Sequence, residues 1–89
     1  MTAEREVRIA NRNGLHARPA AEIVKAAARF RSEITIRRDD MEVNGKSIMG
    51  VMMLAAEYGA TLQLKANGPD AEEALEVLAT LIASRFGET

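Results

Sequence analysis

The sequence contains no cysteine and no tryptophan, and its 89 residues include one tyrosine, two phenylalanines and a single histidine. Without cysteine, disulfides, thiolate metal ligands and a thiol nucleophile are all excluded. With so few aromatic side chains, the core must be built from Ile, Val, Leu, Met and Ala. We therefore expect a tightly packed aliphatic core.

An excess of charge of one sign is also lacking, since 12 Lys and Arg face 13 Asp and Glu for a net charge of −1. Nucleic-acid-binding proteins normally carry a clear basic excess, so we expect no nucleic-acid partner. The absence of aromatic side chains from the expected strands argues further against a small RNA-binding α+β domain.

Long hydrophobic runs are missing as well. The longest uncharged apolar stretch, residues 48–56, is far too short to cross a bilayer. The first residues are charged and lack the apolar centre of a signal peptide. We therefore predict a cytoplasmic location, no membrane association, and one domain over residues 1–89.

Hydrophobic periodicity predicts the order strand, helix, strand, strand, helix, strand, helix. Strands are expected around residues 7–9, 34–36, 41–43 and 62–66, where apolar and polar side chains alternate. Helices are expected over residues 17–30, 48–54 and 71–86, with Pro19 in a first turn, and with Asp70 and Glu73 as an acidic capping box. The pattern predicts a two-layer α+β domain with helices on one face of a mostly antiparallel sheet.

The histidine, His16, lies in residues 14–19, which read GLHARP, between the first strand and the first helix. A neutral imidazole at a helix start offers a nucleophilic nitrogen beside unpaired backbone N–H groups. Arg18 is suited to bidentate contacts with an oxyanion. This combination favours uptake of a phosphoryl group over the alternative, a polar surface histidine without a chemical role.

Two other segments contain residue types that take part in ligand binding. Residues 44–47, NGKS, resemble the end of a Walker loop, but that motif needs a glycine where Asp40 stands. Ser47 is instead expected to cap the second helix, where an added phosphate would also be well placed. Asp39 and Asp40 are expected in a solvated hairpin turn, and we predict no metal site and no cofactor.

Residues 48–56 hold more apolar side chains than one buried helix face accommodates. Val51 and Leu54 are expected in the core, so that some of the methionines must face outward. Because methionine is an adaptable contact residue, we predict a partner-docking patch there.

Residues 14–19 and 43–51 resemble the two signature segments of HPr, the histidine-containing phosphocarrier family of the bacterial phosphotransferase system. The resemblance extends over the whole chain. It implies an open-faced β-sandwich, with a four-stranded antiparallel sheet covered on one face by three helices. It also implies a carrier rather than an enzyme, which takes a phosphoryl group from enzyme I, charged by phosphoenolpyruvate, and passes it to an enzyme IIA component.

The resemblance also implies roles for individual residues. His16 would be phosphorylated at Nδ1, Arg18 would balance the phosphate, and Ser47 matches the site modified by HPr kinase/phosphorylase in many members. The partner-docking surface would comprise Ala17, Ala21, Ile48, Met49 and Met52.

The sequence leaves two alternatives for the function. The methionine pattern of residues 49–53 is closer to regulatory and nitrogen-branch relatives than to many sugar-transport ones, so the branch is undecided. The alternative function is a regulatory binding module that acts through Ser47 phosphorylation without histidine phosphotransfer. A monomer is expected in either case.

Overall fold

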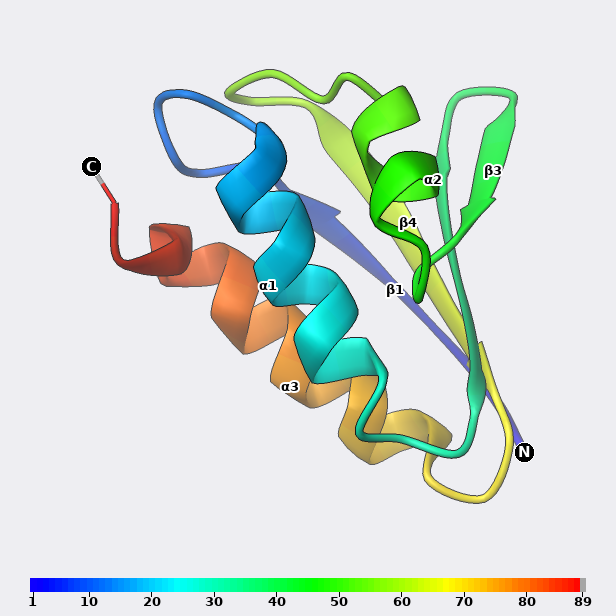
Figure 1. Ribbon diagram of the computed structural model, residues 1–89. Helices are drawn as coiled ribbons and strands as arrows, with labels where there is room; N and C mark the ends of the chain where they lie inside the picture. The colour runs from blue at the N-terminus through cyan, green and yellow to red at the C-terminus, as the bar shows by residue number, and fades with distance from the viewer. Residues whose placement is uncertain (89) are drawn as a thin grey trace.

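The computed structural model describes residues 1–88, and Thr89, the last residue of the expected domain, lies outside the described residues. The elements follow the predicted order (Figure 1). They are β1 (Thr2–Arg8), α1 (Ala17–Ala27), β2 (Glu33–Arg38), β3 (Met41–Asn44), α2 (Ile48–Met53), β4 (Thr61–Asn67), α3 (Ala71–Ala83) and a 3₁₀ turn (Arg85–Gly87).

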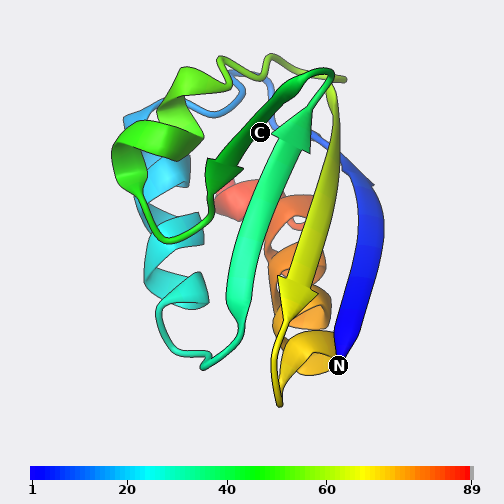
Figure 2. The ribbon, with the colours of Figure 1, turned by 90° about the vertical axis from the view of Figure 1, so that its right-hand side faces the viewer.

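The four strands form one antiparallel sheet in the order β1-β4-β2-β3. Leu64, at the centre of β4, pairs with Arg5 of β1 on one side and with Ile36 of β2 on the other. The helices gather on one face of this sheet and leave the other face open (Figure 2). The predicted open-faced β-sandwich of the α+β class is therefore confirmed.

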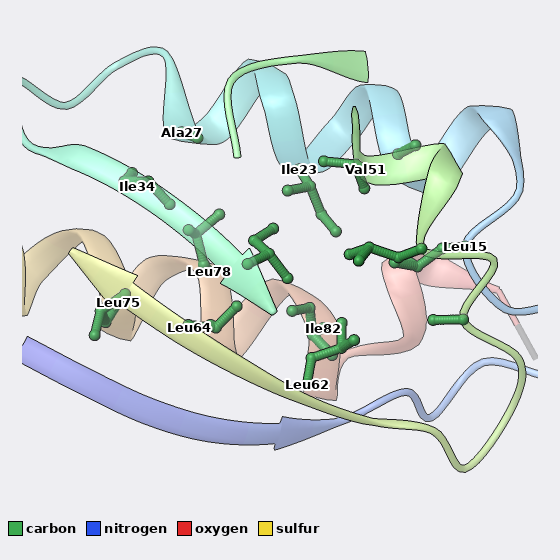
Figure 3. Close-up of a cluster of buried hydrophobic side chains, with 14 of the residues drawn as sticks. Leu15, Ile23, Ala27, Ile34, Val51, Leu62, Leu64, Leu75, Leu78 and Ile82 are labelled. Carbon is green, nitrogen blue, oxygen red and sulfur yellow. The ribbon is translucent and has the colours of Figure 1, made fainter. Parts of the chain in front are cut away.

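The core lies between the sheet and the helices and is almost entirely aliphatic (Figure 3). Alternate residues of the central strands point into it, as the period of two predicted: Ile36, Leu62 and Leu64 are fully buried. Ile23 of α1 and Leu78 of α3 close the core from the helical side and are equally buried. Within residues 1–88, no helix is long and apolar enough to span a membrane.

The predicted capping box at the start of α3 is wrong. Asp70 is the N-cap residue, but its side chain makes no capping hydrogen bond to the described helix. Its carboxylate instead accepts hydrogen bonds from the Arg31 and Ser32 amides, both at 2.9 Å, and from Ser32 Oγ at 2.6 Å. The loop after α1 supplies three donors, which outnumber the single amide that a cap would offer.

The third helix also ends earlier than expected. It stops at Ala83, and the chain then turns through three residues with positive φ, Arg85 (62°), Phe86 (54°) and Gly87 (74°). Phe86 is buried at 3% exposure, so this turn packs back onto the molecule. Glu88, which follows, is thereby directed toward the loop before α1.

Candidate functional site

His16 is the N-cap residue of α1, with an extended backbone (φ −77°, ψ −174°). Its carbonyl oxygen accepts the Ala20 amide at 3.1 Å and so starts the helix, as an N-cap residue does. The ring makes no capping hydrogen bond within the described chain, and 42% of the side chain is exposed. The predicted placement of the histidine at a helix start is therefore confirmed.

The loop before His16 is held from both sides. Asn11 is completely buried, and its Nδ2 donates to the Gly14 carbonyl at 2.8 Å. The Leu15 amide donates to the Ala56 carbonyl at 2.8 Å. Gly14 has φ of 69°, and a Cβ there would overlap the same carbonyl oxygen of Ala56. Only glycine fits this close approach, which fixes the position of the loop that presents His16.

Unpaired backbone donors lie next to the ring. The first N–H groups of any helix lack partners within the helix, and Pro19 has none to offer. The amides of Ala17 and Arg18 remain, and neither makes a hydrogen bond within residues 1–88. Together with the helix dipole, they form a small positive region where a phosphoryl group on His16 would lie.

Arg18 lies beside this region, and few contacts restrict its side chain. Its side chain is 67% exposed, and its guanidinium lies 4.0 Å from carboxylate oxygens of both Glu22 and Glu88. At that length these ion pairs hold the guanidinium weakly, because 4.0 Å is too long for a hydrogen bond. The guanidinium is therefore free to turn toward a new anion at the helix start.

The structure places Glu88 beside His16, although no sequence pattern predicts it there. Both of its carboxylate oxygens lie against His16 Nε2, at 3.1 and 3.2 Å, and Oε1 also accepts from Asn11 Nδ2 at 3.1 Å. Its side chain is only 13% exposed. The hydrogen bond with His16 lowers the pKa of Glu88 below its ordinary value, and the bond with Asn11 adds to this. No local signal marks Glu88, since 72 positions separate it from the histidine.

Ser47 caps α2, as predicted, with its Oγ accepting the Gly50 amide at 3.1 Å. Behind it, Val51 and Leu54 are buried, which confirms the expected core positions. Three methionines of the helix face outward, at 77% exposure for Met49, 42% for Met52 and 64% for Met53.

The five residues expected to dock partners are all exposed. Ile48, Met49 and Met52 lie on α2, and Ala17 and Ala21 lie on the neighbouring α1 (Figure 1). We call these five the docking surface; they are Ala17, Ala21, Ile48, Met49 and Met52.

Residues 1–88 contain no group of three His, Asp or Glu side chains that could hold a metal ion. Asp39 and Asp40 lie in the exposed turn between β2 and β3, as predicted, and Asp39 adopts φ of 53° there.

Comparison with known proteins gives a consistent result. Residues 3–84 match the family described as the PTS HPr component phosphorylation site. The chain is 48% identical to phosphocarrier protein HPr of Cupriavidus necator over 85 residues, which cover 96% of each chain. It is 52% identical to HPr of Treponema pallidum over 82 residues, 92% of this chain and 93% of that one.

Solved structures agree. The crystal structure of HPr-C-His from Thermoanaerobacter tengcongensis matches with a TM-score of 0.94 and 47% identity over 98% of both chains.

Some structural relatives are dimers. An HPr dimer from Thermoanaerobacter tengcongensis matches with a TM-score of 0.79 and 49% identity, over 92% of this chain and 94% of that one. The Bacillus subtilis protein Crh, described as a dimer with a swapped domain, matches with a TM-score of 0.76 and 43% identity, over 91% of this chain and 93% of that one.

From its sequence match, its fold and its relatives together, the chain belongs to the HPr family of phosphocarrier proteins of the phosphotransferase system.

Proposed function

We propose that this HPr-family protein accepts a phosphoryl group on Nδ1 of His16 from phospho-enzyme I, which is charged by phosphoenolpyruvate. It then passes the group to an enzyme IIA component of a sugar or nitrogen-regulatory phosphotransferase system. The observation that carries the proposal is the exposed His16 ring at the N-terminus of α1, with two unpaired amides and a loosely held guanidinium beside it.

The chemistry is a displacement between two histidines. Nδ1 of His16 attacks phosphorus in line, a new P–N bond forms, and the P–N bond of the donor breaks. The electron pair of the broken bond stays on the donor's ring nitrogen. Since one P–N bond replaces another, the step is near balance, and the proposal includes neither a metal nor a cofactor. The Ala17 and Arg18 amides and the Arg18 guanidinium stabilise the charge of the transferred group.

The docking surface serves both donor and acceptor. Its five side chains lie on two neighbouring helices, and His16 stands at the start of one of them. Exposed Met49 and Met52 suit such a shared surface, because methionine adapts to different partners. Contact there would also exclude water from the transferring group and so limit hydrolysis.

Incubation with enzyme I and phosphoenolpyruvate tests the proposal directly. We expect intact-protein mass spectrometry to show an added phosphoryl group that is lost in acid, and no such group on His16→Ala. Circular dichroism of the variant serves as the folding control, and we expect a folded variant because the exposed His16 side chain makes no capping bond to the helix that it starts. An unlabelled wild-type protein would contradict the proposal.

Ser47 supports a second, regulatory role. Its hydroxyl caps α2 directly before Ile48 and Met49 of the docking surface. We propose that an HPr kinase/phosphorylase modifies it, because a phosphate there would put charge beside an apolar contact surface. If His16 were never labelled while Ser47 was, the protein would be a regulatory binding module instead.

A further inference from the structure

The contact between Glu88 and His16 is built from several elements of the fold. Both carboxylate oxygens of Glu88 lie within hydrogen-bond distance of His16 Nε2. Asn11 Nδ2 donates a hydrogen bond to one of these oxygens, and Asn11 itself is completely buried and also donates to the Gly14 carbonyl. The Glu88 side chain, with 13% of its surface exposed, is therefore held in place within the site.

The turn after α3 is shaped to make this contact. Arg85 and Phe86 both adopt positive φ, which is unfavourable for residues with a Cβ. Burial of Phe86 against the core compensates for that conformation. The contact between Glu88 and His16 follows directly after this turn.

The chemistry of the contact determines where the ring proton lies. An ionised carboxylate only accepts hydrogen bonds, so the Nε2 atom that faces it must carry hydrogen. A neutral imidazole carries a single N–H, and Nδ1 is then left with the lone pair. In the described chain, Nδ1 makes no capping hydrogen bond that would occupy this lone pair.

We propose that Glu88 is a positioning residue for phosphoryl transfer, which holds His16 in the Nε2–H tautomer so that Nδ1 is the nucleophile. This inference rests on the proposed function and adds a residue to it.

The proton balance of the step follows from this role. As Nδ1 forms its bond to phosphorus, the proton on Nε2 stays where it is, and the ring gains positive charge. Glu88 faces that charge at 3.1 Å and stabilises it, as the aspartate of a Ser-His-Asp triad stabilises its imidazolium. No proton has to leave the ring of His16 during transfer.

The test combines a spectroscopic and a kinetic measurement on the full chain. The ¹⁵N chemical shifts of the imidazole nitrogens report the tautomer, and single-turnover labelling by phospho-enzyme I reports the rate. In the wild type we expect the Nε2–H tautomer. In Glu88→Ala we expect a mixture of tautomers and labelling slowed about tenfold or more, the equivalent of one hydrogen bond to a charged group.

Two further variants sharpen the comparison. Glu88→Gln keeps an oxygen acceptor for Nε2–H but no charge, so we expect the tautomer to be largely retained and the rate to be intermediate. Glu76→Gln removes the same charge from an exposed position of α3 and serves as the matched control, with wild-type tautomer and rate. Near-wild-type circular dichroism would show that each variant is folded.

The outcomes separate the two proposals. If the wild type is never labelled, the proposed function fails regardless of Glu88. If the wild type is labelled but Glu88→Ala keeps the Nε2–H tautomer, the role of Glu88 is overturned, whatever its rate. A changed tautomer with an unchanged rate would overturn it too.

Discussion

The side chain of Arg18 makes only weak contacts with the rest of the fold. Two thirds of its side chain is exposed, and its ion pairs are 4.0 Å long. Its replacement should therefore change the chemistry and leave the fold intact. We expect Arg18→Ala to slow phosphoryl uptake about 10- to 100-fold, the range of one hydrogen bond to a charged group. Rapid-quench labelling with phospho-enzyme I measures this.

Arg18→Lys discriminates between charge and geometry. Lysine keeps the positive charge but loses the planar, bidentate donors of arginine, so we expect an intermediate rate. Arg29→Ala, an exposed arginine after α1, provides the control with a wild-type rate. Equal rates for Arg18→Ala and the control would show that Arg18 does not contact the transferred group.

Asp70 is the residue whose ionisation should matter most for stability against acid. The Ser32 hydroxyl, followed by the Arg31 amide, lowers the pKa of Asp70 to about 2. Its ionised form therefore stabilises the folded protein above the ordinary pKa of 3.8, and this contribution disappears as the pH falls toward 2. We expect Asp70→Ala to lower Tm at pH 7 and to lower it progressively less between pH 4 and pH 2. A Tm difference that is constant over this range would contradict the assignment.

The residues of the site differ in how well the sequence predicts them. His16, Arg18 and Pro19 lie together in one local motif, and their positions in the first turn follow from helix-start chemistry. Glu88 meets His16 only because the chain turns back after α3. The Asp70 carboxylate likewise accepts hydrogen bonds from amides 38 and 39 positions away, and makes no capping bond to its own helix. Sequence patterns report local periodicity and capping, and they carry no signal for such distant partners.

At the scale of elements, α2 combines a buried side with an exposed apolar side. The spacing of its apolar residues predicted that Val51 is buried. The surplus of methionines predicted that some apolar side chains of the helix are exposed. We expect Met52→Glu to slow transfer both from enzyme I and to the acceptor, because a charge would have to be desolvated on docking. Initial transfer rates at several partner concentrations measure this effect.

Met41→Glu is the matched control for that experiment. Met41 lies at the start of β3 with 43% exposure, against 42% for Met52. The same charge is thus introduced at equal exposure but outside α2. If both variants transfer at the wild-type rate, Met52 does not contact either partner.

The start of α2 allows capping and docking to be separated. Ser47→Ala removes the bond to the Gly50 amide and should lower the free energy of unfolding by about 1 kcal/mol. Ser47→Asp keeps an N-cap acceptor, so its stability should stay near wild type while its added charge slows transfer. Urea denaturation and labelling rates measure the two effects. Wild-type transfer by Ser47→Asp would remove the basis for regulation at this site.

At the scale of the whole molecule, one continuous core joins the sheet to the helices. The two edge strands, β1 and β3, leave backbone groups without a neighbouring strand. Charged side chains on an edge oppose pairing with a second sheet, and β1 carries Glu4, Arg5, Glu6 and Arg8. Because this core is continuous, we propose that residues 1–89 form one domain.

Some relatives of known structure are described as dimers, which makes the oligomeric state of this chain a question for experiment. In this chain, backbone hydrogen bonds hold the segment after β1. The Ile9 amide donates to the Ala60 carbonyl at 2.9 Å, and the Gly59 amide donates to the Ile9 carbonyl at 2.8 Å. The Leu15 amide donates to the Ala56 carbonyl at 2.8 Å. An exchange of β1 between two copies would first have to break these hydrogen bonds along with the pairing to β4, which slows the exchange. We therefore expect the purified protein to elute as a monomer of 9.7 kDa in size-exclusion chromatography with light scattering. A mass that doubles as concentration rises would show that the edge charges and the anchored loop do not prevent assembly.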